Sequence, residues 1–353
     1  SLGASHLKSW RSQMRKVEYL ARRLALAVLV LLSVSVITFV ISRVVPSNPA
    51  ALWVGPHPTK EQIAQARIKL GLDKPLYVQY LRYMGDLLHG DFGVSVASHQ
   101  PILTDLKTYL PATLELVITG MIMAVLIGIP LGVLSGAKKG SLLDHASRLL
   151  AVAGVSMPTF WMGLLLQFFF FGKLKLLPLG GRVDRAISLY NPVQQITGFY
   201  VMDSLISGNW PALRSTFVHL ILPAFTLGTY AIGLTIRMTR STMVEVLEEK
   251  YITAARAAGI PERTILFRLA LKNAIVPTLM VLALSFVYSL TGALLVEVIF
   301  AWPGLGSYVT RAILSLDFPV IMAVTLVVTV FYVFINLFLD IIQTFLDPRV
   351  TLG

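Results

Sequence analysis

The chain contains no cysteine among its 353 residues, which excludes disulfides and every metal site built on thiolates. Charged residues are scarce too: they make up 14% of the chain, compared with about 25% in ordinary soluble domains. Apolar residues make up 56%. At this length the chain could form two soluble domains, but its apolar residues are gathered into long runs, which predicts a single bundle of membrane spans.

The sequence lacks the motifs that mark several classes of function. The phosphate-binding pattern G-x-x-x-x-G-K-[ST] does not occur, and the six histidines show no paired spacing. We therefore expect no catalytic residue, no cofactor site and no metal site in this chain. The formal net charge is +12, but the basic residues lie beside apolar runs, so we expect a membrane surface as the partner and not a nucleic acid.

Six apolar runs come close to the ~20 residues that cross a bilayer core. They predict an all-α membrane protein with six transmembrane helices, at about 24–45, 112–134, 149–171, 218–236, 274–299 and 318–339. The first run is too long for the apolar region of a secretory signal, so it is expected to remain as a span. The predicted transmembrane domain therefore occupies residues 24–345.

Lysine and arginine counts predict the orientation of these spans. The tails 1–23 and 346–353, with the loops 137–148 and 237–273, hold 17 basic residues in about 80. The segments on the other side hold 12 in about 130, and include the long loops 46–111 and 172–217. Both termini and the loop 237–273 are therefore expected in the cytoplasm, with the two long loops outside.

Local patterns predict further details. Glu61–Leu70 and Leu76–Leu88 are expected to form short helices that lie along the membrane interface or cap the bundle. Gly128, Gly132 and Gly136 recur every four residues, which predicts a face for close helix packing rather than a substrate contact. Other expectations are a kink at Pro130 and a hydrogen-bonded interior histidine at His219.

A charged, helix-favouring block runs from Glu249 to Pro277 between two apolar spans. A block of this kind cannot lie in hydrocarbon, so it is expected to form a water-exposed hairpin. Gly259 suits the left-handed residue that ends one helix, and Pro261 suits the first turn of the next. Helix, glycine turn and helix make a protruding knob, which is a surface for docking a partner.

The knob resembles the EAA loop of the membrane subunits of ABC importers, with Thr253-Ala254-Ala255 in place of Glu-Ala-Ala and Gly259 as the glycine. The rest of the chain is similar, over nearly its whole length, to permeases of the dipeptide/oligopeptide/nickel branch. The matching phrases are GLDKPLYVQYLRYMGDLLHGDFGVS (71–95), LPATLEL (110–116), GVSMPTFW (154–161), LILPAFTLG (220–228) and EVIFAWPGLGSYVTRAILSLDFPV (297–320). In this order they are specific, and the long loop 172–217 favours the dipeptide-type subunit.

The resemblance implies a multi-pass permease in a prokaryotic plasma membrane. Its partners would be a second homologous permease, two ATPase subunits that hold ATP and Mg²⁺, and an external substrate-binding protein. ATP binding would draw the coupling loops together and open the bundle outward for di- or oligopeptides. The residues expected to couple to the ATPases are Tyr251, Thr253, Ala254, Ala255, Ala257, Ala258, Gly259, Ile260 and Pro261.

The fifth predicted span follows the coupling loop directly and supplies the candidate pathway residues. Ser285, Tyr288 and Ser289 are spaced to share a helix face, although their hydroxyls are as readily satisfied by their own helix. Glu297 and Trp302-Pro303-Gly304 are the candidate external gate. The alternatives are that Glu297 reaches interfacial water, that Trp302-Pro303-Gly304 makes a short re-entrant or surface turn, and that Trp302 anchors the chain at the interface.

Other functions stay open at this stage. Similar permeases carry nickel chelates or oligosaccharides. A secondary transporter is a different class, but it usually keeps ionisable residues in mid-membrane, and the predicted spans are nearly free of them. A membrane scaffold without transport is a third possibility.

Overall fold

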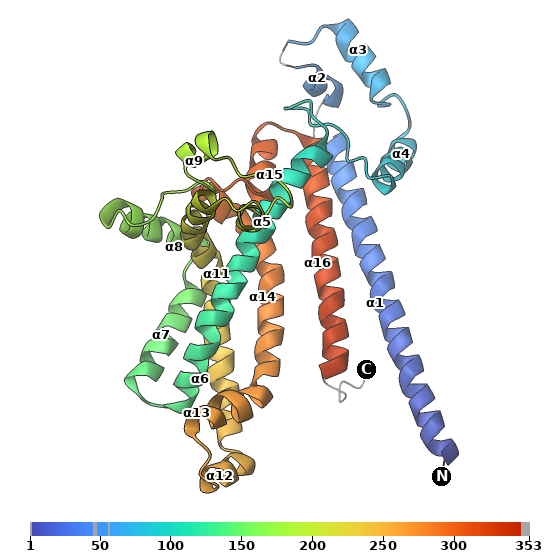
Figure 1. The fold of residues 1–353 in the computed structure, drawn as a ribbon. Coiled ribbons are helices and arrows are strands. Elements are labelled where there is room, and N and C mark those ends of the chain that lie inside the picture. The colour runs from blue at the N-terminus through green and yellow to red at the C-terminus, as the bar shows by residue number, and fades with distance from the viewer. Residues whose placement is uncertain (1, 45–47, 56, 347–353) are drawn as a thin grey trace. The chain divides into compact units, whose positions relative to one another are not determined.

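The computed structural model describes residues 2–44, 48–55 and 57–346 of the chain. These residues are mostly helical and form no β-strand beyond one isolated bridge between Val94 and Pro101, which confirms the all-α prediction. The predicted C-terminal tail lies outside the described residues, except for Leu346. The helices, with three π-helical turns, are α1 (Leu2–Val44), α2 (Pro49–Val54), α3 (Lys60–Lys69), α4 (Leu76–Leu88), α5 (Ile102–Met123), η1 (Ala124–Gly128), α6 (Ile129–Ala137), α7 (Leu142–Ser156), α8 (Thr159–Leu166), η2 (Gln167–Lys173), α9 (Arg185–Tyr190), α10 (Tyr200–Ile206), α11 (Trp210–Leu247), α12 (Lys250–Ala257), α13 (Glu262–Thr264), η3 (Ile265–Ala270), α14 (Leu271–Ile299), α15 (Leu305–Leu314) and α16 (Phe318–Leu346) (Figure 1).

Five helical stretches in the described residues are long and apolar enough to cross a membrane. They are Ala21–Arg43, Ile102–Ala137, Trp210–Leu247, Glu262–Ile299 and Phe318–Phe338. A sixth candidate is the pair Leu142–Ser156 and Thr159–Lys173, which is bent by 113°. Each of the six predicted ranges overlaps one of these stretches, four of them entirely.

The third predicted range differs from the prediction of one span, because two helices meet there at a sharp bend. Met157 leaves the helical region with ψ of 131°, and Pro158 follows at the start of α8. Proline has no N–H to donate, and it disfavours helical backbone at the residue before it. The phrase Met157-Pro158 therefore breaks the span that the apolar run alone suggested.

The described residues divide into two compact units, and the first runs to Asp105 and resumes at Arg311. In this unit α1 and α16 pack side by side and run in opposite directions (Figure 1, blue and red). The two predicted short helices of the first long loop are confirmed as α3 and α4. A capping box between Thr59 and Gln62 fixes the start of α3. Apolar side chains of α1 such as Leu29 and Ile37 are more than half exposed, as expected of a helix that faces lipid.

The second unit, from Leu106 to Thr310, is built around α11. This helix packs against α5, η1, α6, α7, α8 and α14, and most of its inward side chains are buried. Asn209 caps its start by accepting a hydrogen bond from the Ala212 N–H, and Pro211 occupies the first turn. The core of the unit gathers apolar residues of α5, α11 and α14 with Phe300 and Trp302.

The glycines predicted to form a packing face lie where α6 meets α11. A Cβ atom on Gly132 would lie 2.5 Å from Thr239 Cβ and 3.0 Å from the Ile236 carbonyl oxygen. Gly128 and Gly136 are equally close to the side chains of Thr235 and Met243. The packing prediction is therefore confirmed, and the two backbones approach each other without intervening side chains.

A π-helical turn precedes Pro130, where a kink was predicted. Residues Ala124–Gly128 adopt this wider turn, and Pro130 follows in the first turn of α6. A π turn inserts one extra residue, which relieves the clash between the proline ring and the carbonyl of the preceding turn. The helix can therefore continue through Pro130 with its glycine face still against α11.

An ion pair between partly exposed Arg240 and a buried carboxylate closes one end of the α6–α11 contact. Asp144, 1% exposed, accepts hydrogen bonds from Arg240 Nε at 2.5 Å and Nη2 at 2.9 Å. Ser135 Oγ and the Gly140 N–H also donate to this carboxylate. Three helices, α6, α7 and α11, and the turn between α6 and α7 are thus joined at one charged group, with every carboxylate oxygen satisfied.

Substituting Gly132 by alanine tests the close approach of α6 and α11. The added methyl group would lie against Thr239 and the Ile236 carbonyl, and such overpacking costs roughly 1–3 kcal/mol. We expect a lower unfolding temperature for the subunit in detergent, measured by a thermal-shift assay. Gly292→Ala is the matched control, since no atom lies within 4 Å of its added Cβ. An equal effect at both glycines would contradict the account.

Candidate functional site

The charged block between α11 and α14 forms the predicted helix–glycine–helix turn. Gly259 has φ of +76°, which confirms the left-handed residue. The Ile260 N–H donates to the Ala255 carbonyl at 3.2 Å, and the Gly259 N–H donates to the Arg256 carbonyl at 3.0 Å. These two bonds define a Schellman motif, and Ile260 makes its usual apolar contact with the core below. The chain therefore reverses at Gly259 with its last helical carbonyls satisfied.

Two side-chain contacts close the turn from either side. Arg256 and Glu262 form an exposed ion pair at 2.8 Å across the glycine. Nearer the base, Asn273 Nδ2 donates to the Tyr251 hydroxyl at 2.8 Å. Exposed pairs of this kind contribute little to stability, so the shape of the knob depends mainly on its backbone and apolar base.

The predicted coupling residues divide between the outside and the inside of the knob. Tyr251 and Pro261 are exposed, as are Thr253, Ala254 and the run Ala257–Gly259, whereas Ile260 is half-buried. Ala255 is only 9% exposed and lies in an apolar core with Val133 of α6 and Met243 of α11. It therefore supports the knob from inside and does not present a contact surface. The same core includes Ile265 and Ala274, so it also joins the knob to the base of α14.

The predicted gate residues meet in one buried polar cluster. Glu297 is fully buried, which corrects the alternative that it reaches interfacial water. Its carboxylate accepts hydrogen bonds from Thr113 Oγ1 at 2.6 Å and from the Ser307 N–H at 2.9 Å. Thr113 in turn accepts from the Leu305 N–H at 2.8 Å. Glu297 thus lies at the N-terminus of α15, where a helix favours negative charge.

Trp302-Pro303-Gly304 connects α14 to this N-terminus. It was predicted to form a re-entrant or surface turn, and the surface alternative is wrong. Trp302 is fully buried, and its indole N–H donates to the Ala112 carbonyl at 2.9 Å. Gly304 leaves no room for a side chain, since a Cβ there would lie 2.2 Å from a Glu297 carboxylate oxygen. Burial of an aromatic ring in protein also rules out a lipid-facing tryptophan anchor.

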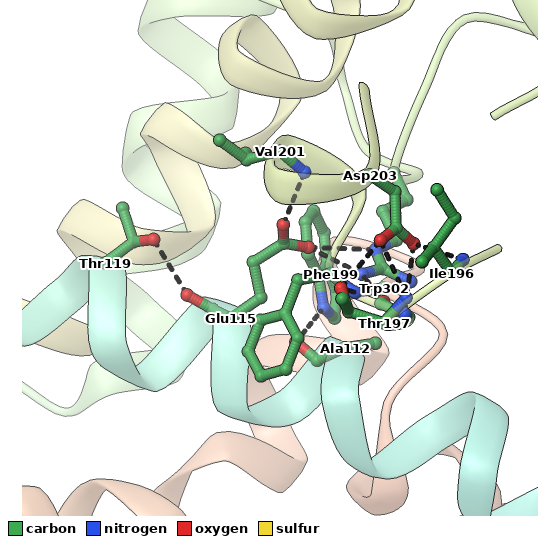
Figure 2. Close-up of polar contacts among 11 residues, drawn as sticks. Ala112, Glu115, Thr119, Ile196, Thr197, Phe199, Val201, Asp203 and Trp302 are labelled. Carbon is green, nitrogen blue, oxygen red and sulfur yellow. Dashed lines mark hydrogen bonds and ion pairs between the residues drawn. The ribbon is translucent and has the colours of Figure 1, made fainter. Parts of the chain in front are cut away.

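A second carboxylate of the cluster, Glu115 of α5, is paired with Arg182 from the loop after η2. The two side chains are 4% and 5% exposed and lie 2.6 Å apart. Figure 2 shows Glu115 reaching from α5 toward Val201, whose N–H donates to it at 2.8 Å. The guanidinium of Arg182 also donates to the Gly198 carbonyl and lies 3.7 Å from the centre of the Tyr200 ring. This pair fastens the second long loop onto α5.

The loop beside this pair is held by a third buried carboxylate, that of Asp203 in α10. It accepts hydrogen bonds from the N–H groups of Ile196, Thr197 and Gly198, and from the Thr197 hydroxyl (Figure 2). These bonds hold the pKa of Asp203 below its ordinary value, although burial acts in the opposite direction. The charged form of this carboxylate therefore stabilises the loop at neutral pH.

Sequence reasoning missed the Glu115–Arg182 pair. The available signal was Glu115 itself, the single charge in an apolar span, since an ionised group there needs a partner. The partner lies 67 positions further along the chain, and no local spacing points to it.

The predicted pathway residues do not share one environment. Ser285 and Ser289 are 2% and 6% exposed, and they lie on the buried face of α14, which packs against α11. Tyr288 is 66% exposed and stacks on Tyr230 of α11 with ring centres 5.4 Å apart. Spacing of three and four residues placed these side chains near one another, but the boundary between the buried and exposed faces passes between them.

The prediction that His219 is a hydrogen-bonded interior histidine is confirmed. His219 is 5% exposed, and its Nδ1 lies 2.8 Å from the Ser215 carbonyl. Its Nε2 is 3.6 Å from an Asp184 carboxylate oxygen. Within the part of the chain that the structure describes, no group of histidines and carboxylates is arranged to hold a metal ion.

Replacing Glu115 by glutamine tests whether the pair with Arg182 holds the second long loop. A buried guanidinium left without its carboxylate costs about 3–5 kcal/mol. We expect faster cleavage of the loop 172–209 by added protease, and a lower unfolding temperature. The double variant Glu115→Gln/Arg182→Gln removes the uncompensated charge and is expected to recover part of the loss. A double variant less stable than Glu115→Gln alone would contradict this account.

Comparison with known proteins identifies the family. Residues 128–352 match the family described as binding-protein-dependent transport system inner membrane component, and residues 16–117 match its N-terminal component. Among similar proteins is the probable D,D-dipeptide transport system permease DdpB of Escherichia coli K12, at 44% identity over 92% of this chain and 95% of the relative. The dipeptide permease DppB of Alkalihalophilus pseudofirmus is 41% identical over 94% and 98%, and the di/tripeptide permease DppB of Pseudomonas aeruginosa is 38% identical over 95% and 98%. The chain therefore belongs to the family of inner membrane permease components of binding-protein-dependent transport systems.

Proposed function

We propose that this chain is one of two permease subunits of an ATP-driven importer of di- and oligopeptides. The observation that carries the proposal is 37–44% identity, over more than nine-tenths of the chain, to several permeases named for dipeptide transport. None of these relatives is named for nickel or oligosaccharides. The matched family is described as a transport system membrane component, so we propose that the chain's own task is to bind and move and not to catalyse a reaction.

The knob is the proposed point of contact with the ATPase subunits. Its exposed surface includes four small residues, Ala254, Ala257, Ala258 and Gly259, beside the Arg256–Glu262 ion pair, so a partner's groove can approach the backbone closely there. Its inner surface shares an apolar core with α6, α11 and α14. Because packed interiors are stiff, a shift of the knob is transmitted directly to these spans. ATP and Mg²⁺ would be held by the ATPases and not by this chain.

The proposed transport step is alternating access. Closure of the ATPases draws the knobs of the two permeases together, the bundle opens toward the external binding protein, and peptide enters between the subunits. We place the path on the exposed face of α14 marked by Tyr288, with Ser285 and Ser289 supporting that helix from behind. The turn Trp302–Gly304 and Glu297 form the proposed external gate, since they fix where α14 ends and α15 begins.

Gly259→Val and Ala258→Glu test the coupling role of the knob. Valine opposes the φ of +76° at this turn, and glutamate adds an unpaired charge to the exposed contact surface. We expect both variants to insert normally, to lose most of the ATPase subunits in a pull-down, and to reduce dipeptide uptake at least about tenfold, the effect of about 1.4 kcal/mol of lost contact energy.

Ala255→Glu is the informative comparison, because Ala255 faces inward. It should reduce the amount of folded subunit rather than its affinity for the ATPases. Normal coupling in both Gly259→Val and Ala258→Glu would contradict the assignment of the knob.

The absence of native cysteine allows a direct test of topology. We propose that both chain ends and the knob lie in the cytoplasm, on the basis of the twofold bias in basic residues. Single cysteines at Lys139 and Ser241 should then react with an impermeant maleimide only after permeabilisation. Cysteines at Ser98 and Ser207 should react on intact spheroplasts. All four positions are at exposed residues. Labelling of Ser241→Cys from outside would overturn the orientation.

A further inference from the structure

A cavity of about 490 Å³ lies in the first unit, where α1 ends and α16 begins. It meets a second cavity of about 120 Å³, and Arg43, Leu70, Tyr83 and Asp86 line both. The larger volume is typical of a pocket for a small molecule. Neither cavity is used by the proposed coupling or gating residues.

Three buried polar atoms without a hydrogen-bond partner gather at these cavities. They are Arg43 Nε, Tyr83 Oη and Gln79 Oε1. The Gln79 amide is oriented by its other end, since its Nε2 donates to the Lys74 carbonyl at 2.7 Å. Burial, together with the neighbouring Tyr80, raises the pKa of Tyr83, so its hydroxyl keeps its proton and can donate. Buried polar atoms normally have partners, so this combination of two donors and one acceptor points to an absent polar ligand.

Charge divides the cavities into a cationic end and an apolar end. Arg43, Lys74 and Arg82 surround the smaller cavity against a single carboxylate, that of Asp86. The larger cavity is also lined by Lys69 and Asp91, and it continues along apolar side chains that include Phe92, Val94, Leu316, Phe318 and Met322. A ligand that fits both ends has an anionic head and an apolar body.

The pocket lies at the level where two spans leave the hydrocarbon. Arg43 is the last residue of the first candidate span, and Phe318 is the first residue of the last one. The phosphates of a bilayer lie at this depth, and the acyl chains lie beside the spans. An amphiphile at this position is therefore oriented as a membrane phospholipid is.

The walls of the pocket are fixed by contacts within the same unit. The Phe39 ring of α1 lies against the rings of Tyr80 and Tyr83 of α4, with centres 5.3 and 5.8 Å apart. On the opposite wall, Asp317 accepts hydrogen bonds from Ser95 Oγ at 2.5 Å and from the Ala97 N–H at 3.0 Å. Asp317 is 1% exposed and precedes α16, so it binds the loop 94–97 to the start of that helix. Contacts within the unit therefore hold both walls of the pocket in place.

We propose that this pocket binds one glycerophospholipid, with its phosphate on Arg43 and Tyr83 and an acyl chain along Leu316, Phe318 and Met322. Arginine and a phenol are suited to phosphate oxygens, and the excess of cations favours an anionic lipid such as phosphatidylglycerol. The glycerol hydroxyls of that headgroup can donate to Gln79 Oε1 and Asp86. The site is independent of the peptide proposal, since it requires only that α1 and α16 span a membrane.

Native mass spectrometry of the complex of this chain with its partner subunits, in detergent with added phosphatidylglycerol, tests the site. We expect one retained lipid per complex, with occupancy about tenfold lower in Arg43→Gln, a change equivalent to about 1.4 kcal/mol. Tyr83→Phe should lower the lipid occupancy by a smaller factor. Arg22→Gln is the control, because Arg22 is exposed near the other end of the same span and should not affect retention. Equal retention in Arg43→Gln and Arg22→Gln would overturn the proposal.

Two further experiments distinguish a membrane lipid from a soluble ligand in this pocket. Millimolar inorganic phosphate, or a dipeptide, should not displace the lipid, and displacement by either would overturn the lipid assignment in favour of that soluble ligand. A phosphatidylglycerol with a photoreactive acyl chain should label the wild-type complex in the peptide Leu316–Met322, which needs no variant that folds. Labelling of the complex elsewhere but not in this peptide would also overturn the proposal.

Discussion

The close approach of α6 to α11 is the contact on which the second unit depends. Helices in hydrocarbon gain little from burying apolar side chains, because lipid is equally apolar, so they associate through close packing and polar contacts. Gly128, Gly132 and Gly136 let the two backbones meet without side chains between them. Gly120 and Gly228 continue the contact toward the other end of α11, where a Cβ on Gly228 would lie 2.7 Å from the Gly120 carbonyl oxygen. This seam determines where the remaining helices of the unit can pack.

Charged groups are placed at the ends of this seam and absent from its middle. Asp144 and Arg240 join the helices at the end nearer the knob, and Glu115 and Arg182 join α5 to the second long loop at the other end. Ionised groups are costly in the bilayer centre and are tolerated where partners satisfy them. Asp144 lies in the first turn of α7 and Arg182 lies in the loop after η2, so each pair connects a long helix to the turn or loop beside it. In the proposed mechanism these are the two places where motion must pass between the bundle and a soluble partner.

The sequence predicted those parts of the structure that depend on local rules. Apolar length located the spans, Gly259-Ile260-Pro261 located the turn, and the spacing of four residues located the glycine face. Prediction from the sequence failed for residues whose positions depend on contacts with distant segments of the chain. Trp302 was expected near the surface because tryptophan favours interfaces, but an acceptor on Ala112, 190 positions away, holds it inside. Ala255 was grouped with its exposed neighbours, because the motif does not say which helix face is buried.

The Glu297 side chain shows the same limit. Its position near the end of a span suggested contact with water, and the carboxylate is instead enclosed by the N-terminus of α15 and the Thr113 hydroxyl. Those partners lie in two other segments, so no window of sequence contains the answer. By contrast, the bend at Met157-Pro158 could be predicted from the local sequence, since proline disfavours helical backbone at the residue before it. Apolar continuity outweighed that signal in the prediction of a single span.

The most direct test of the account is transport by the reconstituted complex. This chain, its second permease and the two ATPase subunits are placed in proteoliposomes, with the binding protein and a radiolabelled dipeptide on one side. The account predicts that dipeptide crosses only when ATP is present on the opposite side, where the knob lies, and that an imposed proton or sodium gradient has no effect. Uptake that follows an ion gradient without ATP would contradict it.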